Sequence, residues 1–221
     1  MPIKALLLDF DGVLVNSESC HIKAWDIATK NILKLELSAD HLNSLRGKSS
    51  RYIAQMLCRT HGVPNKVSDL LEEKLKLLCE SEPPPLYPGV REFLEAIRKE
   101  NIPHGIASNS PRRFLERTAS KQQINVNMIL GLEDYRQPKP SPEPYLKLAS
   151  KLEISISDHP YTLGIEDSPH GIDALVAAGM KAIAVSTTQS REAFKNKNIE
   201  LLADHIGSSS VIEYIDSMLQ A

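Results

Sequence analysis

The stretch KALLLDFDGVLVNSES, residues 4–19, places two aspartates directly after a short apolar run. Residues 3–10 are apolar with few breaks and a glycine follows, which is typical of a strand buried on both faces of a parallel sheet. Asp9 and Asp11 are two positions apart, so in an extended chain their side chains point to the same side. Because buried carboxylates without partners cost free energy, the pair indicates a cation, hydrogen-bond donors or catalysis at this strand end.

The whole chain has the size and charge of an ordinary globular protein. Its 221 residues suit one domain plus a smaller insert. With 26 basic and 28 acidic side chains the formal charge is -2, so no basic field favours nucleic acid or an anionic membrane surface. We therefore expect a small-molecule partner, and neither nucleic acid nor a membrane.

The cysteine spacing and the lack of a long apolar segment favour the cytoplasm as the compartment. Cys20, Cys58 and Cys79 follow neither a C-x-x-C nor a zinc-finger spacing, which argues against a disulfide framework and a structural metal site. The amino terminus lacks the pattern of a secretory leader, and no run of about 18 apolar residues suits a membrane span. We expect a cytoplasmic protein that acts as a monomer.

Residues 16–86 carry helical periodicity and no strand pattern. Apolar residues recur at helical spacing from about Ser17, and again around 53–58 and 70–78. The segment ESEPPPLYPG, residues 80–89, then interrupts helical structure with four prolines and a glycine, as a linker between domains does. These patterns predict an all-α insert over residues 16–86, which could act as a lid.

After the linker, helix and strand patterns alternate four times. The predicted pairs are VREFLEAIRKE with PHGIAS, PRRFLERTAS with VNMIL, EPYLKLASKL with YTLGIED, and GIDALVAAG with KAIAV. This alternation is typical of a doubly wound parallel sheet with right-handed crossovers. We therefore predict an α/β core of the Rossmann-like type, formed by residues 1–15 and 87–221, whose ligands bind beyond the carboxyl ends of the strands.

Hydroxyl and amide groups follow the second predicted strand. In ASNSP, residues 107–111, Ser108, Asn109 and Ser110 stand before a helix that opens with proline, the first-turn position that proline favours. Hydroxyls and free N–H groups at a helix start suit an anionic oxygen. Helix capping explains Ser110 equally well.

Charged groups follow two further strands. Lys139 lies in QPKPSPEPY, a stiff proline-rich loop, where it could bind phosphate as a point charge or be a solvated surface lysine. Glu166 and Asp167 end the strand in GIEDSPHGI, where they could bind Mg²⁺ or cap the next helix. An isolated D-x-D-G is likewise more often a turn or a helix cap. Acid pairs, hydroxyls and a lysine at successive strand ends are nevertheless the parts that phosphoryl transfer needs.

The motifs DFDGVLVNS, SN, KPSPEPY and GIEDSPHGI resemble, in order and spacing, the four motifs of the haloacid dehalogenase superfamily. Within it the chain is similar to the branch of β-phosphoglucomutase and its phosphatase relatives, which carry a helical cap after the first motif. The resemblance covers nearly the whole chain, and it implies the haloacid dehalogenase fold and phosphoryl transfer with Mg²⁺ as the cofactor.

The resemblance also implies roles for the motif residues. Asp9 would be the nucleophile that forms an aspartyl-phosphate, and Asp11 the general acid and base, with its backbone carbonyl on the metal. The remaining implied sites are phosphate binding by Ser108, Asn109 and Lys139, and metal binding by Asp9, Asp11, Glu166 and Asp167.

For residues of the cap, the resemblance implies substrate contacts, and each has a structural alternative. His21 and Trp25, four residues apart on one helix face, could approach the substrate or form a packing pair in the cap. In LRGKSSR, Arg46, Lys48 and Arg51 resemble a substrate-specificity loop for an anionic group, or form a solvated basic loop.

Three other positions qualify the cap assignment. Asn16 stands where the family often has aspartate, and Ser50 where the mutase-like pattern tends to have arginine. Lys74 is a weaker candidate for the substrate site.

The resulting prediction is a Mg²⁺-dependent phosphatase acting through an aspartyl-phosphate on a small phosphorylated metabolite, a sugar phosphate or a related compound. The main alternative is a hexose phosphate mutase of the β-phosphoglucomutase type, which would use the same two aspartates. A non-catalytic binding protein on this fold is the third hypothesis, and the presence of both Asp9 and Asp11 argues against it.

Overall fold

The structure, a computed structural model, describes residues 2–220. Its internal contacts divide the chain into two compact units. One unit holds the residues up to Asn16 together with those from Pro85 onward, and the other spans Ser17–Pro84. The first is an α/β unit and the second is helical.

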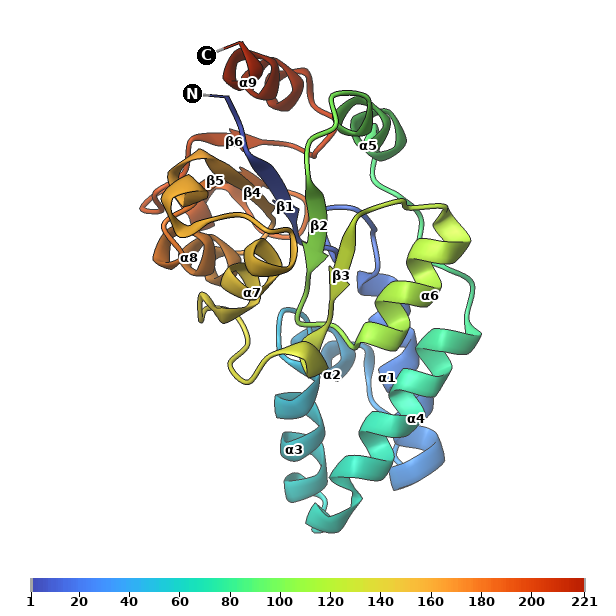
Figure 1. Cartoon of the computed structure of the whole chain (residues 1–221). Coiled ribbons are helices and arrows are strands. Elements are labelled where there is room, and N and C mark those ends of the chain that lie inside the picture. Colours follow the sequence, from blue (N-terminus) through green and yellow to red (C-terminus); the bar gives the residue numbers. More distant parts are fainter. Residues whose placement is uncertain (1, 221) are drawn as a thin grey trace. The chain divides into compact units, whose positions relative to one another are not determined.

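The α/β unit contains a six-stranded sheet in the order β3-β2-β1-β4-β5-β6, and every neighbouring pair is parallel (Figure 1). The strands are β1 (Ala5–Leu8), β2 (His104–Ala107), β3 (Met128–Leu130), β4 (Thr162–Glu166), β5 (Lys181–Val185) and β6 (Leu201–Ala203). The sheet confirms the predicted doubly wound α/β fold. Only β6, a three-residue and partly exposed edge strand, falls outside the predicted strands.

Strand β1 lies at the point where the strand order reverses. Its four residues are fully buried between β2 and β4, with Leu8 paired to Ile106 on one side and to Ile165 on the other. The apolar run thus forms a central strand, as predicted, and Asp9 is the first residue beyond it. In open α/β sheets the crevice at such a switch point is where ligands bind.

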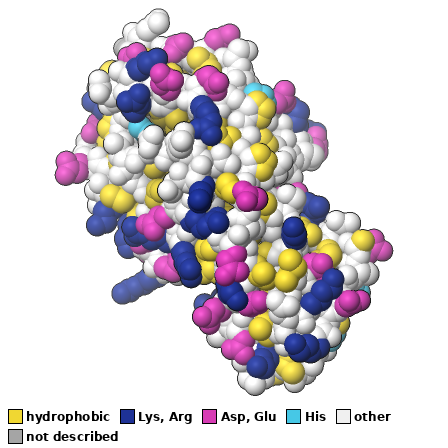
Figure 2. All heavy atoms as spheres, turned by 90° about the vertical axis from the view of Figure 1, so that its right-hand side faces the viewer, with side chains coloured by type: hydrophobic (Ala, Val, Ile, Leu, Met, Phe, Trp, Pro, Cys, Tyr) yellow, Lys and Arg dark blue, Asp and Glu magenta, His cyan; other side chains and the backbone are white. Residues whose placement is uncertain are grey.

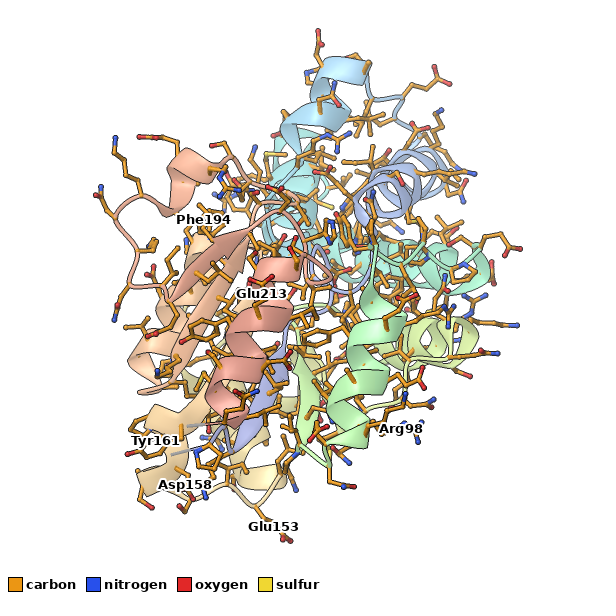
Figure 3. The ribbon with its side chains drawn as sticks, turned by 90° about the horizontal axis from the view of Figure 1, so that it is seen from above. Arg98, Glu153, Asp158, Tyr161, Phe194 and Glu213 are labelled. Atoms are coloured by element: carbon orange, nitrogen blue, oxygen red, sulfur yellow. The ribbon has the colours of Figure 1, made fainter. Side chains whose placement is uncertain are left out.

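Helices cover both faces of the sheet. The helices of this unit are α5 (Val90–Lys99), α6 (Arg112–Gln122), α7 (Glu143–Lys151), α8 (Pro169–Ala177) and α9 (Ser209–Leu219), with short 3-10 helices η2 (Leu132–Asp134), η3 (Ile156–Tyr161) and η4 (Arg191–Phe194). Tyr145 and Leu148 of α7 and Leu175 of α8 pack with Leu7 and Ala184 of the strands in one buried cluster. Helices α5 and α9 lie next to each other on the opposite face (Figure 3). Helix α9 was not predicted.

The helical unit is built from α1 (Glu18–Leu33), α2 (Ala39–Ser44), α3 (Ser50–Thr60) and α4 (Val67–Glu80), with the 3-10 helix η1 (Pro64–Lys66). Trp25, Ile53, Leu57 and Leu70 form its buried core. The three predicted helical stretches are confirmed as α1, α3 and α4, whereas α2 has only six residues and no buried side chain, so it lacks an apolar period to detect.

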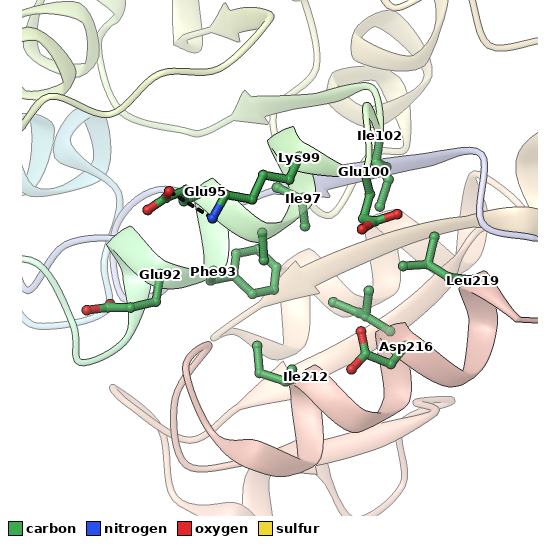
Figure 4. A pocket seen from close by; sticks show the side chains of 12 residues that line it. Glu92, Phe93, Glu95, Ile97, Lys99, Glu100, Ile102, Ile212, Asp216 and Leu219 are labelled. Carbon is green, nitrogen blue, oxygen red and sulfur yellow. Dashed lines mark ion pairs between the residues drawn. The ribbon is translucent and has the colours of Figure 1, made fainter.

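A groove of about 400 Å³ lies between α5 and α9 (Figure 4). Phe93, Ile97 and Ile215 form part of its lining, while its carboxylates include Asp216 and the Glu95 that pairs with Lys99 at 3.0 Å. No residue of the four motifs lines this groove, so the chemistry predicted from the sequence has to be sought at the strand ends.

On the face shown in Figure 2, basic and acidic side chains are intermixed over the surface. Across residues 2–220, none of the helices combines the length and the apolar character that crossing a membrane requires.

Candidate active site

The carboxyl ends of β1 and β4 and the loop before α7 meet at one lysine. The Nζ atom of Lys139 lies 2.5 Å from Oδ1 of Asp9 and 2.6 Å from Oε1 of Glu166, so it donates to both carboxylates. The side chain of Lys139 is only 4% exposed. The alternative of a solvated surface lysine is therefore wrong, and residues far apart in the sequence form one buried charge cluster.

The charge of Lys139 is stabilised by its two carboxylates. Burial alone lowers the pKa of a lysine, but the negative charges of Asp9 and Glu166 outweigh that effect and hold the pKa of Lys139 well above its usual range. The ring of Tyr145 lies beneath the ammonium, with Nζ 4.7 Å from the ring centroid. Lys139 is thus a fixed positive charge at the end of the sheet.

Three buried carboxylates surround that single ammonium. Oxygens of Asp9, Glu166 and Asp167 lie within 4.8 Å of one another. Burial raises the pKa of Asp9 well above its usual value despite the opposing charge of Lys139. Burial, followed by the charge of Glu166, raises the pKa of Asp167 to about 7. The cluster therefore carries more negative charge than one lysine neutralises, and a second cation would relieve it.

The donor set fits a hard divalent cation such as Mg²⁺, which prefers one or two carboxylates together with water and phosphate oxygens. Within residues 2–220, no hydrogen-bond donor is recorded on Oδ2 of Asp9 or Oδ1 of Asp167. These two nearly buried carboxylates each keep an oxygen available for a cation. Asp9 and Asp167 are accordingly the residues that fit best as direct ligands.

Glu166 differs from the other two carboxylates because both its oxygens are already engaged. Oε1 accepts from Lys139 and from the hydroxyl of Tyr145 at 2.7 Å. Oε2 accepts from the backbone N–H of Asp167 at 3.1 Å and from the backbone N–H and hydroxyl of Ser168. These contacts tie Glu166 into the start of α8. They make it an anchor for the cluster in addition to its predicted place in the metal site.

Asp11 is directed to the loop after β2. Its Oδ2 accepts a hydrogen bond from the hydroxyl of Ser110 at 2.5 Å and a longer one from Ser108 at 3.4 Å. Helix α6 begins after Pro111 without a side-chain cap, so the capping alternative for Ser110 is wrong. The side chain of Asp11 is absent from the carboxylate cluster around Lys139, and its predicted metal contact, through the backbone carbonyl, stays a prediction.

Asn109 joins two of the predicted motifs. Its Oδ1 accepts from the backbone N–H of Lys139 at 3.2 Å, and its Nδ2 donates to the carbonyl of Lys139 at 3.5 Å. The hydroxyl of Tyr135 donates to the carbonyl of Ser108 and to Oδ1 of Asn109. Asn109 therefore links the loop after β2 to the lysine loop, and its predicted contact with phosphate stays a prediction.

The carboxylates of Asp167 and Glu166 occupy space that is open only because glycines at positions 12 and 171 have no side chain. Gly12 has a φ of +84°, and a Cβ there would lie 2.0 Å from Oδ2 of Asp167. A Cβ on Gly171 would lie 1.8 Å from the carboxyl carbon of Glu166. Because real Cβ atoms do not approach that closely, a side chain at either position would displace a carboxylate.

Comparison with known proteins identifies the family. The model of the family described as haloacid dehalogenase-like hydrolase matches residues 6–185. The chain belongs to this hydrolase family. Membership confirms the resemblance drawn from the four motifs, and with it the predicted class of enzyme.

Relatives of this hydrolase match over most of the chain. It is 27% identical to a beta-phosphoglucomutase of Bacillus subtilis (strain 168) over an alignment of 198 residues, and this alignment covers 85% of each chain. It is 27% identical to hexitol phosphatase B of Escherichia coli (strain K12) over an alignment of 201 residues, and this alignment covers 86% of each chain. A crystal structure of a HAD hydrolase of family IA, variant 3, from Entamoeba histolytica HM-1:IMSS has a TM-score of 0.81 at 25% identity and covers 99% of this chain and 100% of that one.

Several site residues of the hydrolase were not predicted. Tyr145 was placed only in a predicted helix and in the KPSPEPY motif, and Tyr135 was given no role, although each hydroxyl donates to a motif residue. Thr187 and Thr188 follow β5 and donate to the carbonyl of Gly12 and to Asp167. Their position at the carboxyl end of a parallel strand is the signal that could have identified them.

In the helical unit of the hydrolase, Trp25 is a core residue. It is 2% exposed and packs in the cluster of Ile53 and Leu70. This burial favours the packing alternative for Trp25. His21 of the same helix has its Nδ1 2.8 Å from Nζ of Lys74, so the two residues that were considered for substrate contact lie side by side.

Lys74 is almost fully buried at 2% exposure. Its Nζ also donates to the hydroxyl of Ser50 at 3.1 Å and lies 5.5 Å from the centroid of the Trp25 ring. Ser50, which stands where the mutase-like pattern tends to have arginine, thus serves as an acceptor for this lysine.

The predicted basic loop of the helical unit lies partly in a helix, since Arg51 belongs to the first turn of α3. Arg46 forms an ion pair with Glu18 and donates from Nε to Asn43 at 3.4 Å, so its charge is already partly balanced. Lys48 and Arg51 are both exposed. Whether this loop binds substrate stays a prediction.

The raised pKa values predict how the metal-free hydrolase responds to pH. Between the ordinary pKa of 3.8 and the value of about 7 for Asp167, the folded chain holds a proton that the unfolded chain has released. The free energy of unfolding therefore falls as the pH rises through this window, and the raised pKa of Asp9 acts in the same direction. We expect a loss of roughly 3 kcal/mol between about pH 5 and pH 8.

Denaturant unfolding in EDTA at both pH values measures this loss. Mg²⁺ should restore stability at the higher pH, and Asp167→Asn should flatten the pH dependence because its amide does not titrate. A metal-free protein that is more stable at the higher pH would contradict the assignment of uncompensated buried carboxylates.

Proposed function

We propose that this hydrolase is a Mg²⁺-dependent phosphatase that cleaves a small phosphorylated metabolite, a sugar phosphate or a related compound, through an aspartyl-phosphate. The observation that carries the proposal is the buried ion cluster in which the ammonium of Lys139 contacts Asp9 and Glu166 beside Asp167. The relatives named for sugar-phosphate and hexitol-phosphate chemistry support the substrate class.

The first half-reaction uses two aspartates. A carboxylate oxygen of Asp9 attacks phosphorus, a new O–P bond forms, and the bond to the leaving oxygen breaks. Asp11, held by the hydroxyl of Ser110, donates a proton to that leaving oxygen. When Mg²⁺ is bound it supplies positive charge that offsets the negative charge of the phosphoryl group. Lys139 supplies a second positive charge and offsets repulsion between the phosphate and Asp9.

The second half-reaction returns the enzyme to its starting state. Asp11, now ionised, takes a proton from a water molecule, which attacks phosphorus and displaces the carboxylate of Asp9 as inorganic phosphate forms. The same residue thus serves first as the acid and then as the base. Ser108 lies next to Asp11 and has a hydroxyl suited to a phosphate oxygen.

We further propose that the helical unit is a cap that selects the substrate and limits entry of water. Lys48, which precedes α3, and Arg51, in the first turn of α3, are exposed basic residues, which suits an anionic group on the substrate. This role rests on the proposed phosphatase function.

The second candidate is a hexose phosphate mutase. The relationship to beta-phosphoglucomutase favours it, because Asp9 and Asp11 would serve equally well if a sugar hydroxyl replaced water as the acceptor. A non-catalytic binding protein is disfavoured by the buried, charge-paired arrangement of Asp9 and Lys139, which costs free energy to maintain.

A phosphate-release screen separates these candidates. The purified protein is assayed with Mg²⁺, and with EDTA as the control, against sugar phosphates, hexitol phosphates and phosphorylated organic acids. We expect Mg²⁺-dependent release of phosphate that is selective for one compound class. Glucose 1-phosphate is followed for glucose 6-phosphate in parallel, since isomerisation without release would identify a mutase, and no turnover of either kind would contradict both proposals.

A further inference from the structure

The loop that follows β5 reaches the site through two consecutive hydroxyls. Oγ1 of Thr187 donates to the backbone carbonyl of Gly12 at 2.5 Å. Oγ1 of Thr188 donates to Oδ2 of Asp167. No motif recognised in the sequence includes this segment, so a fifth strand end contributes to the site in addition to those that carry the motifs.

The hydroxyl of Thr188 determines which oxygen of Asp167 is available. A carboxylate that accepts a hydrogen bond on one oxygen is fixed in rotation and presents the other oxygen outward. In this structure Oδ2 is the engaged oxygen, and Oδ1 has no recorded donor among residues 2–220. Oδ1 is therefore the oxygen that Asp167 can offer to a cation.

Thr187 contacts the backbone of Gly12, which packs against the same carboxylate. Gly12 follows Asp11, and the position of its absent Cβ lies 2.0 Å from Oδ2 of Asp167 and 3.0 Å from Cγ2 of Thr188. The backbone of Gly12, the carboxylate and the two threonines are therefore in direct packing contact. The hydrogen bond from Thr187 to Gly12 links the end of β5 to the loop that carries the aspartates.

We propose that Thr187 and Thr188 are positioning residues for the divalent-cation site: Thr188 orients Asp167, and Thr187 holds the Asp11–Gly12 backbone against it. The inference rests on the proposed Mg²⁺-dependent function. Loss of the hydroxyl of Thr188 should weaken cation binding by about tenfold to a hundredfold, as is typical when a group that orients a metal ligand is removed.

The chain offers a matched control in the preceding residue. The hydroxyl of Ser186 donates to the carbonyl of Ala203 in β6 at 3.2 Å, away from the carboxylates. Ser186→Ala therefore removes a hydroxyl from the same loop without touching the site. Thr188 is itself exposed, so its replacement disturbs little core packing.

The experiment compares Thr188→Val, Thr188→Ala, Thr188→Ser and Thr187→Val with the wild type and Ser186→Ala. Metal-free protein is titrated with Mg²⁺ while its thermal midpoint is recorded, and Mn²⁺ binding is measured by electron paramagnetic resonance. The valine and alanine variants at 188 should need about tenfold or more Mg²⁺ for half of the stabilisation. Thr188→Ser should recover wild-type binding, Thr187→Val should show a smaller shift, and Ser186→Ala none.

A kinetic split gives the second readout. The Mg²⁺ concentration for half-maximal rate should rise in Thr188→Val, while kcat at saturating Mg²⁺ falls much less. Wild-type cation affinity in both Thr188→Val and Thr188→Ala would overturn the inference while leaving the phosphatase proposal intact. A wild-type protein that neither binds Mg²⁺ nor releases phosphate would overturn the proposed function, and this inference with it.

Discussion

Asp9→Asn is expected to lower phosphate release by at least ~10³-fold and to abolish formation of the phosphoenzyme, because the amide cannot attack phosphorus. Asparagine has nearly the shape of aspartate, and Lys139 keeps Glu166 as a partner at 2.6 Å. The fold should therefore persist. Turnover is measured by phosphate release, and the covalent intermediate by intact-protein mass spectrometry after a rapid acid quench.

The control for this prediction is Asp204→Asn. Asp204 pairs with Arg191 on the surface, and its side chain is 79% exposed. This variant should keep wild-type turnover and the phosphoenzyme signal. If Asp9→Asn remained folded and still accumulated a phosphoenzyme, Asp9 would not be the nucleophile.

Lys139→Met should combine a loss of activity with a loss of stability. Methionine fills similar space but leaves Asp9 and Glu166 without the ammonium that both contact. Removing one partner of a buried ion pair typically costs about 3–5 kcal/mol. Because the positive charge that Lys139 offers to phosphate is lost as well, we expect turnover to fall by ~10²-fold or more.

The pH dependence of this stability loss identifies its cause. Below about pH 6 the buried carboxyls can take up protons, because the pKa values of Asp9 and Asp167 are already raised by burial. The deficit of Lys139→Met relative to the wild type should therefore shrink in acid. Unfolding by denaturant at pH values near 5.5 and 8 measures it.

Lys195→Met is the matched control. The side chain of Lys195 is 68% exposed and pairs with Glu192 at 3.1 Å, so its replacement should change stability by no more than about 0.5 kcal/mol. Equal stability and equal kinetics for Lys139→Met and the wild type would show that the buried ion cluster is unimportant for the enzyme.

Most of the order of elements could be predicted because most long elements carry their own period, although the eleven-residue helix α9 was missed. The buried run of β1 and the amphipathic pattern of α5 are local properties, and both were recognised. Helix α2 was missed because its six residues are too few to show a period, and the three-residue edge strand β6 was missed as well. Their formation depends on neighbours: β6 exists because Leu202 pairs with Ala184 of β5.

The candidate site divides in the same way. Asp9 and Asp11 are close in sequence, so an extended strand already directs them to one side. Lys139 could be named from its motif, but its burial between Asp9 and Glu166 could not. A lysine in a proline-rich loop is usually solvated, and only the packing of Tyr145 beneath the ammonium and the carboxylates around it reverse that expectation.

By itself the sequence determined the fold class, the family and the strand ends that carry the chemistry, because these depend on local periodicity and on short motifs. Only the tertiary structure decided which oxygens are free for a cation and which hydroxyls hold them. Thr188 and Asp167 follow different strands, and they meet because β4 and β5 are neighbours in the sheet. A hydrogen-bond partner of that kind is a property of strand order, which no local pattern in the chain records.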